Sequence, residues 1–322
     1  MSQHIVLVTG GAGFIGSELV RQLLEDEATV LVYDNLSFGH LANLPTHSDL
    51  HFEKGDVTDL PQMRSLVRKF SPEKVFHLAA IHFIPYCMAR PQETLRINVE
   101  GTANVLEACK SSSVRTLVCA STAAVYAVQD GPHGENDPID PIDVYGVSKL
   151  CMEHLVRLFH RDTGIRCAIA RLFNAYGPRE TNPHVIPEIV KQLSIGNCIE
   201  LGNLAPKRDY IHTSDVCRAL RQMADADSYQ IDTFNVATGQ AYSAGELIDL
   251  FAELLRTKIS VVSTEGRRRA TERPNLVGDV AKIGRLIGWK PEVSMRDGLA
   301  DLLDTSGQVC DATGASGDGR PA

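Results

Sequence analysis

Short apolar runs alternate with longer amphipathic stretches along the first half of this chain of 322 residues. Short apolar runs are typical of buried strands, whereas apolar residues that recur every three to four positions are typical of helices. This alternation predicts an α/β fold, a doubly wound parallel sheet with helices on both faces, whose ligands bind beyond the carboxyl ends of the strands. The predicted strands are His4–Thr9, Thr29–Tyr33, Leu50–Lys54, Lys74–Leu78, Arg115–Ala120 and Arg166–Leu172, and the clearest helices are Ser17–Leu24, Gln92–Lys110 and Val144–Arg161.

The pattern changes after Asn174, where prolines at positions 178, 183, 187 and 206 divide the chain into shorter segments. We expect residues 1–174 to form the main domain and residues 175–304 mainly a smaller, substrate-binding domain. A further strand near 232–237 could return to the main sheet. Residues 305–322 are rich in Gly, Ser, Asp and Ala, which predicts a disordered tail.

A glycine-rich loop joins the first predicted strand to the first helix. Gly10 would allow a tight turn, Gly13 would let the backbone approach a pyrophosphate, and Gly16 would let the helix pack on the strand. The helix N-terminus then faces the anion. The loop therefore predicts a site for a dinucleotide.

An acidic residue, Asp34, ends the second predicted strand about twenty residues beyond this loop. A carboxylate there can accept hydrogen bonds from the ribose hydroxyls of NAD, and it would repel the 2′-phosphate of NADP. NAD is therefore the expected cofactor. The alternative is that Asp34 is a turn residue that caps the strand.

A tyrosine and a lysine, Tyr145 and Lys149, lie four residues apart in the predicted helix at 144–161. This spacing puts both side chains on one helical face, where the ammonium would lower the pKa of the phenol from about 10 towards neutrality. Such a phenol can exchange protons with a sugar hydroxyl. An isolated pair of this kind would more often be an ordinary pair on the solvent side of a helix, so the glycine loop upstream carries the argument.

Composition fits an enzyme of this kind. The hydrophobic fraction is 43%, the net charge is −8, and the densest basic cluster is Arg267–Arg269, so nucleic acid is not an expected partner. No apolar run reaches membrane-spanning length and no signal peptide precedes the first strand, so we expect a cytoplasmic protein without a membrane partner. The eight cysteines contain no Cys-x-x-Cys, which predicts reduced, buried thiols and no metal site.

Several further motifs accompany the loop and the Tyr-x-x-x-Lys pair, over roughly residues 4–303. With them the chain resembles the extended short-chain dehydrogenase/reductases, a family of Rossmann fold, and within it the nucleotide-sugar epimerases and dehydratases. The motifs are Thr9–Gly16, Asp34–Ser37, Gly55–Val57, His77–Ala80, Asn98–Thr102, Ser121–Tyr126, Arg171–Asn174 and Arg208–His212.

The resemblance implies roles for particular residues. NAD would be held by Gly10, Gly13, Phe14, Ile15, Gly16, Asp34, Asn35, Ser37, Asp56, Val57, Leu78, Ala79, Ala80, Asn98, Tyr145, Lys149 and Phe173. Asn174, Arg208 and Arg273 would meet the diphosphate of a nucleotide-sugar substrate, the two guanidiniums through forked hydrogen bonds. One departure is that Arg273-Pro274 is followed by Asn275 and Leu276, where the family often has Gly-Asp.

The resemblance also implies a mechanism. Tyr145 would take the proton from the sugar C4 hydroxyl, Thr122 would hydrogen-bond the same oxygen, and Lys149 would bond the nicotinamide ribose. In related dehydratases an Asp-Glu pair follows this threonine, and in related decarboxylases a glutamate stands at the second position. Here Ala123 and Ala124 follow. Their presence favours 4-epimerisation, unless Glu180 or Asp143 replaces the missing carboxylates.

Other assignments stay open at this stage. His82 is either a contact of cofactor or substrate or a structural histidine, and Arg179 either meets a substrate carboxylate or caps nearby carbonyls. UDP-hexose, UDP-hexuronate and N-acetylated sugars are all possible substrates. A dehydratase, a 4-ketoreductase or a non-enzymatic NAD-binding protein are the alternative functions. A homodimer through the helices at 92–110 and 144–161 is expected, although these faces would also serve packing on the sheet.

Overall fold

The computed structural model describes residues 4–180, 182–263 and 273–305. The basic cluster at 267–269, Cys310 and positions 306–322 of the predicted tail lie outside these residues.

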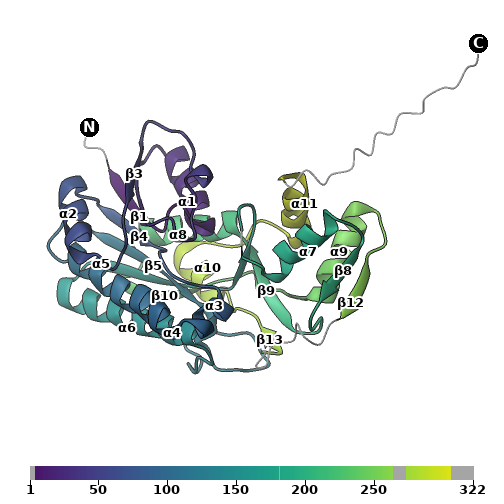
Figure 1. Cartoon of the computed structure of the whole chain (residues 1–322). Coiled ribbons are helices and arrows are strands. Elements are labelled where there is room, and N and C mark those ends of the chain that lie inside the picture. The colour runs from purple at the N-terminus through teal and green to yellow at the C-terminus, as the bar shows by residue number, and fades with distance from the viewer. Residues whose placement is uncertain (1–3, 181, 264–272, 306–322) are drawn as a thin grey trace, which may run out of the picture.

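A parallel sheet of seven strands forms the main body, as predicted (Figure 1). The strand order is β3-β2-β1-β4-β5-β6-β10, and all neighbouring strands run parallel. β10 lies at the edge beside β6, with Ile231 in register with Cys167, where the sequence left a returning strand open. The strands are β1 (Ile5–Thr9), β2 (Thr29–Asp34), β3 (Leu50–Lys54), β4 (Lys74–His77), β5 (Thr116–Thr122), β6 (Arg166–Leu172) and β10 (Ile231–Val236).

Helices cover both faces of this sheet because its strands are apolar on both sides. In β1, Val6 and Val8 enter one hydrophobic core while Leu7 enters the other. The first core includes side chains of α1 (Phe14–Glu25), α8 (Thr213–Asp225) and α10 (Ala281–Ile287). The second includes those of α2 (Leu60–Phe70), α5 (Gly101–Cys109) and α6 (Val144–Thr163). The doubly wound α/β prediction is confirmed.

The helical run predicted at 92–110 differs in detail. It consists of α4 (Pro91–Leu95), one π-helical segment at Arg96–Glu100 and α5, and the short α3 (Ile84–Ala89) precedes it. The wide π turn contains Asn98, whose carbonyl accepts a hydrogen bond from the Thr102 hydroxyl. Such segments interrupt a helix without a sequence signature, and they often occur near functional sites.

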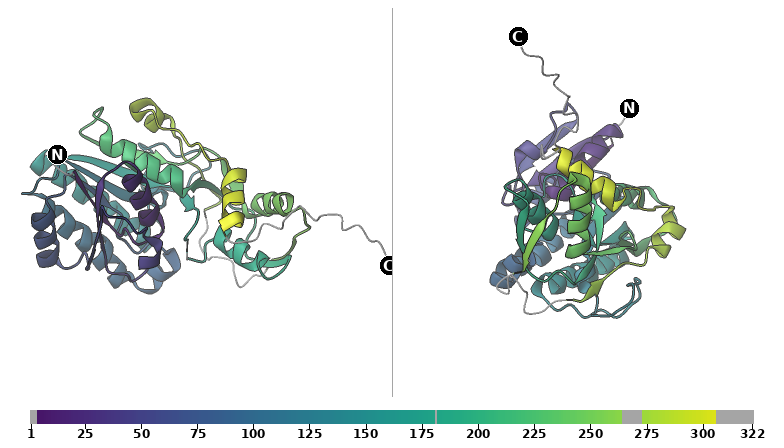
Figure 2. Two further views of the ribbon diagram at one scale, coloured as in Figure 1. Left: turned by 90° about the horizontal axis from the view of Figure 1, so that it is seen from above. Right: turned by 90° about the vertical axis from the view of Figure 1, so that its right-hand side faces the viewer.

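A smaller part is built from the C-terminal half of the chain and lies beside the carboxyl edge of the main sheet (Figures 1 and 2). Its core contains Tyr176, Ile189, Leu201, Phe251 and Leu299. Its elements are β7 (Asn174–Tyr176), α7 (Val185–Leu193), β8 (Cys198–Leu201), β9 (Lys207–His212), β11 (Ala241–Ser243), α9 (Ala244–Leu255), β12 (Ser260–Ser263), β13 (Asn275–Leu276) and α11 (Met295–Thr305). The boundary at residue 174 and the substrate-binding role of this part stay predictions.

All the cysteines that the structure describes are free thiols. Cys87, Cys109, Cys119, Cys167 and Cys217 are buried as predicted, whereas Cys151 and Cys198 are exposed, contrary to the prediction. Among the helices of the described ranges, none combines the length and apolarity needed to cross a membrane.

A buried ion pair fastens α6 to the sheet. The carboxylate of Glu153, in α6, accepts hydrogen bonds from Arg171 Nε (2.9 Å) and Nη2 (2.8 Å), and the Ser121 hydroxyl donates a third (2.7 Å). The Glu153 and Arg171 side chains are 0% and 4% exposed. Burial alone would raise the pKa of Glu153, but the hydrogen bonds and charge of Arg171 outweigh it and lower the pKa.

We predict that Glu153→Gln destabilises the protein by about 3–5 kcal/mol, because it leaves the buried Arg171 charge uncompensated. Urea unfolding followed by circular dichroism measures this. Arg64→Ala is the control, since Arg64 and Glu107 form an exposed pair (49% and 38%) whose loss should cost no more than about 1 kcal/mol. Equal effects of the two substitutions would contradict the prediction.

Candidate active site

A large cavity of about 1080 Å³ opens at the carboxyl ends of the sheet strands. The strand ends contribute Gly10, Asp34, Leu78, Thr122 and Phe173 to its lining, which are residues at or just after β1, β2, β4, β5 and β6. The other wall comes from the smaller part, with Arg208 and Arg273 and the segment that precedes α7. This is the position at which doubly wound sheets bind ligands.

The glycine loop packs so tightly that larger residues are excluded. Gly10 has φ +73°, and a Cβ there would lie 2.7 Å from the Ala79 backbone nitrogen. A Cβ on Gly16 would lie 2.1 Å from the Gly10 carbonyl oxygen. The contact lets α1 begin directly behind the loop, with no acidic residue in its first turn. Gly10, Gly13, Phe14, Ile15 and Gly16 all line the cavity, so the helix N-terminus offers a place for a diphosphate.

Asp34 ends β2 as predicted and lines the cavity. Its carboxylate accepts hydrogen bonds from the backbone amides of Ala12 (3.0 Å) and Leu36 (2.8 Å). Burial raises the pKa of Asp34, while the two amide bonds oppose that shift. A carboxylate fixed in this way has a defined orientation for ribose hydroxyls. Asn35 and Ser37, in the loop that follows, also line the cavity.

The remaining residues of the expected NAD pocket divide into two groups. Val57, Leu78, Ala79, Ala80 and Phe173 line the cavity. Asp56 and Asn98 are not among its lining residues, and both act through hydrogen bonds to their neighbours.

The Asp56 carboxylate accepts hydrogen bonds from Asn35 (2.8 Å) and from the amide (2.9 Å) and hydroxyl (2.8 Å) of Thr58. Burial alone would raise the pKa of Asp56, but these hydrogen bonds outweigh it and lower the pKa. The Asn98 side chain is buried and bonds both backbone groups of Ile81 (2.8 and 2.9 Å) and the Ser148 hydroxyl (2.9 Å). Asn98 therefore positions the chain that lines the pocket, and its expected contact with the cofactor stays a prediction.

Thr122, Tyr145 and Lys149 lie together in the cavity wall. Thr122 ends β5, and its hydroxyl accepts a hydrogen bond from the Ala124 amide (3.1 Å) and hydrogen-bonds the Tyr145 side chain. Tyr145 and Lys149 project from the first turns of α6, which is capped by the Asp143 carboxylate through the Gly146 amide (2.7 Å). The Lys149 ammonium donates to the Ala120 carbonyl (2.8 Å).

The expected fall of the phenol pKa is not what these surroundings produce. Burial raises the pKa of Tyr145, and the hydrogen bond from Thr122 opposes it only in part. Burial also lowers the pKa of Lys149 to about 8. Desolvation disfavours the charged form of each group, and the ammonium is directed at a backbone carbonyl.

Three residues expected to meet the diphosphate, Asn174, Arg208 and Arg273, line the cavity. Arg208 Nη1 donates to the carbonyls of Lys207 (2.9 Å) and Arg273 (2.8 Å). Arg273 donates to the carbonyls of Ala124 (3.2 Å) and Ala127 (3.3 Å), and burial lowers its pKa while Asp143 and Asp140 oppose that shift. Two guanidiniums on one wall provide a positively charged surface for a phosphorylated ligand.

Arg179 has partners that the sequence did not predict. It has φ +70°, and it is not among the residues that line the large cavity. Its guanidinium bonds the Ser17 hydroxyl (3.2 Å) and the Glu18 carboxylate (2.6 Å), both in α1. Arg179 therefore joins the smaller part to α1, through partners that the sequence did not predict, and a contact with a substrate carboxylate stays a prediction.

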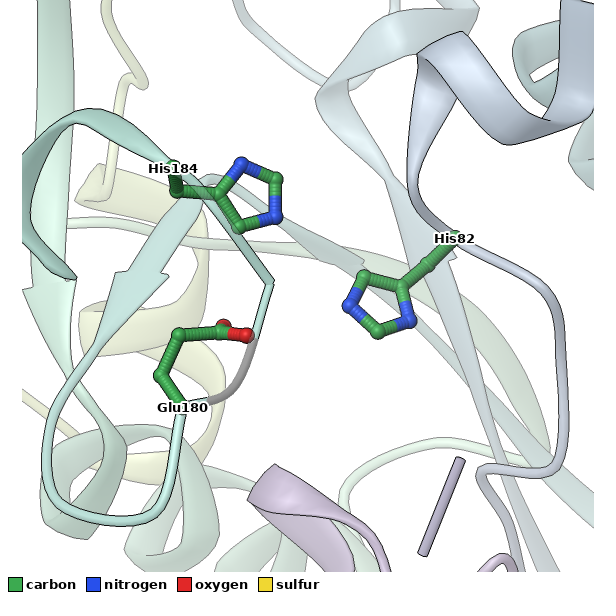
Figure 3. A group of neighbouring side chains, drawn as sticks. All are labelled: His82, Glu180 and His184. Atoms are coloured by element: carbon green, nitrogen blue, oxygen red, sulfur yellow. The ribbon is translucent and has the colours of Figure 1, made fainter. Parts of the chain in front are cut away.

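His82 lies in the cavity wall together with two residues that the sequence did not connect with it, Glu180 and His184 (Figure 3). His82 Nε2 is 3.0 Å from the Asn182 amide nitrogen, and the His82 and His184 rings stack with their centroids 6.1 Å apart. Burial, with the charges of His184 and Lys149, lowers the pKa of His82 to about 4. Glu180 was considered only as a replacement carboxylate, and no signal marked His184.

Comparison with known proteins decides the family. A family model described as GDP-mannose 4,6 dehydratase matches residues 7–302. The chain belongs to this family. The UDP-glucose 4-epimerase of Lactobacillus helveticus is 30% identical over 94% of this chain and 95% of its own length. The dTDP-glucose 4,6-dehydratase of Streptomyces griseus is 31% identical over 93% of this chain and 93% of its own length.

A solved structure agrees with these relatives. The UDP-glucose 4-epimerase of Thermus thermophilus in complex with NAD superposes with a TM-score of 0.85, at 30% identity, over 93% of this chain and 98% of that one. The predicted extended short-chain dehydrogenase/reductase family and the NAD cofactor are thereby confirmed. The protein is an NAD-dependent enzyme of the nucleotide-sugar epimerases and dehydratases.

Asp34→Ala should weaken NAD binding and narrow the preference of NAD over NADP, because it removes both a hydrogen-bond acceptor and a charge that repels the 2′-phosphate. Titration of both cofactors against apoprotein measures the two affinities. Asp49→Ala, which removes an exposed carboxylate beside His47, is the matched control. An unchanged preference of NAD over NADP would mean that the loop at Asn35 and Ser37, and not Asp34, determines this preference.

Proposed function

We propose that the protein is a nucleotide-sugar 4-epimerase that acts on a UDP-hexose or a UDP-hexuronate. The observation that carries this proposal is the cavity wall beside Thr122, where Ala123 and Ala124 provide no acid or base. The nearby Asp143 carboxylate caps α6 through the Gly146 amide. Elimination at C5 and C6 would need a carboxylate at this wall. The similarity to a UDP-glucose 4-epimerase supports the same choice.

The substrate would lie between the two walls of the cavity. Arg208 and Arg273 would bond the diphosphate together with Asn174, since all three line the wall opposite the glycine loop. The sugar would then extend towards Thr122 and Tyr145, near His82. The cavity of about 1080 Å³ is lined by both the expected NAD residues and the expected substrate residues, so it would hold both molecules together.

NAD, held by the glycine loop, Asp34 and Lys149, supplies when bound a hydride acceptor and donor and a positive nicotinamide ring that favours the phenolate form of a nearby tyrosine. Tyr145 would take the proton from the C4 hydroxyl and later return it to the C4 oxygen, once the ketose has rotated so that the hydride returns to the opposite face of C4. Thr122 orients the C4 oxygen through its hydroxyl. Lys149, one helical turn beyond Tyr145, adds positive charge and orients the ribose. General acid–base assistance of this kind contributes about 10²–10⁴-fold, and positioning supplies much of the rest.

We further propose a homodimer that forms through α4 and α6. These helices are in contact, and they carry exposed apolar side chains: Leu95 is 40% exposed, Val147 is 42% exposed and Leu158 is 44% exposed. In extended family members such faces often form a four-helix bundle between two copies. A cytoplasmic location stays a prediction.

Tyr145→Phe should lower kcat by at least about a hundredfold while fold and NAD content persist, because the oxygen that transfers the proton is lost and the ring is kept. Steady-state assays with UDP-glucose and UDP-glucuronate measure this. Thr122→Ala should be milder. Tyr242→Phe, outside the cavity lining, is the control and should retain full activity. Turnover at the native rate in Tyr145→Phe would remove this residue from the mechanism.

Turnover in deuterium oxide should give a C4-inverted product without carbon-bound deuterium, because rotation and hydride return break and reform only one carbon–hydrogen bond, the one at C4, and keep the hydride within the enzyme. Elimination would exchange the C5 proton with solvent. NMR and mass spectrometry of the product distinguish the two. Deuterium at C5, or a product lighter by water or carbon dioxide, would refute the epimerase proposal and point to Glu180 as the recruited carboxylate.

A further inference from the structure

Two imidazoles and one carboxylate converge on one point of the cavity, from opposite walls (Figure 3). His82 follows β4, in the connection to α3, whereas Glu180 and His184 lie between β7 and α7. One potential ligand atom of each lies within 4.8 Å of the other two. All three residues are half-buried and belong to the cavity lining. In Figure 3 the His184 ring and the Glu180 carboxylate point across the gap towards His82.

This set of donors has the chemistry of a transition-metal site. Two neutral imidazoles with one carboxylate suit ions such as Zn²⁺, Co²⁺ or Fe²⁺, whereas Mg²⁺ and Ca²⁺ prefer oxygen ligands alone. Tetrahedral Zn²⁺ with bonds of about 2.1 Å requires donors about 3.4 Å apart. The donors lie within 4.8 Å of one another, so they would have to approach by at most about 1.4 Å to reach this spacing. Three protein ligands also leave a coordination position for water or a substrate oxygen.

We propose that His82, Glu180 and His184 bind one divalent transition-metal ion, with Zn²⁺ as the best fit, across the cavity. The ion would join the main body to the segment that precedes α7. The Asn182 side chain, 3.0 Å from His82 Nε2, already makes a weaker link between the same two walls, and the ion would displace it. The sequence predicted no metal site because almost a hundred residues separate His82 from the other two ligands.

Co²⁺ titration of the untagged, NAD-loaded full chain, followed by visible absorption and calorimetry, tests this site. One Co²⁺ per chain should bind with the spectrum of nitrogen and oxygen ligands. Even the loss of a residue that only orients a metal ligand weakens binding about 10–100-fold, so His184→Ala, Glu180→Ala and His82→Ala should each weaken it at least about tenfold. Asn182→Ala should leave binding unchanged or tighter. NAD content and circular dichroism verify that each variant is folded.

The matched control is His47→Ala, which removes an exposed imidazole 3.7 Å from the Asp49 carboxylate, outside the cavity. It should bind Co²⁺ like the parent protein. Zn²⁺ should raise Tm in the parent and in His47→Ala but not in His82→Ala, since His82 is the one of the three ligands that comes from the main body, and without it the ion cannot join the two walls.

Three results would overturn the proposal: no binding, binding that survives the loss of His184 and Glu180, or a sulfur-to-cobalt charge-transfer band that places the ion on cysteine. None of these measurements depends on turnover. Failure of the epimerase proposal would therefore leave the metal result intact, and failure of metal binding would leave the epimerase proposal intact.

Discussion

The attachment of α6 to the sheet is the constraint on which the active site depends. Two buried polar contacts fix it: the Glu153–Arg171 pair and the bond from Lys149 to the Ala120 carbonyl. Because both lie within the first three turns of α6, they set the rotation and the depth of the helix against β5 and β6. Tyr145 then meets Thr122 at the end of β5. A helix held by apolar packing alone could slide, and the proton-transfer geometry would slide with it.

The sequence predicted what is encoded locally. Hydrophobic periodicity predicted the strands of the main sheet, turn chemistry predicted the glycine loop, and spacing predicted the place of Asp34. The contacts in these elements either join residues close in sequence or repeat along a strand. The pairing of Arg179 with Glu18 was not predicted because Glu18 lies more than 160 positions away, and nothing near position 179 indicates it. The cluster of His82, Glu180 and His184 escaped prediction for the same reason. The hydrogen bonds of Asn98 were not predicted because its π turn has no sequence signature.

The protonation of Tyr145 shows where reasoning from spacing fails. The four-residue spacing predicts that Lys149 lowers the phenol pKa. The sign of the shift, however, also depends on desolvation, and the spacing gives no information about burial. In this wall burial favours the neutral form of both groups, raising the phenol pKa and lowering the pKa of the ammonium to about 8. A hydrogen bond from Thr122 is not enough to reverse this. As the proposed base, Tyr145 would be activated chiefly by charge that arrives with the cofactor, and proton transfer would then be coupled to cofactor binding.

A similar restraint governs the choice of reaction. A 4-ketose intermediate has an acidic proton at C5, next to its carbonyl group. A base near C5 would therefore promote elimination. At the wall beside Thr122 the chain supplies two methyl groups, and the neighbouring carboxylate of Asp143 is engaged by the Gly146 amide. Epimerisation would then depend on the absence of a free base near C5 as much as on the proton-transfer groups near C4. A metal ion at His82, Glu180 and His184 would strengthen this control, because coordination would occupy the Glu180 carboxylate, which lines the same cavity as the ketose.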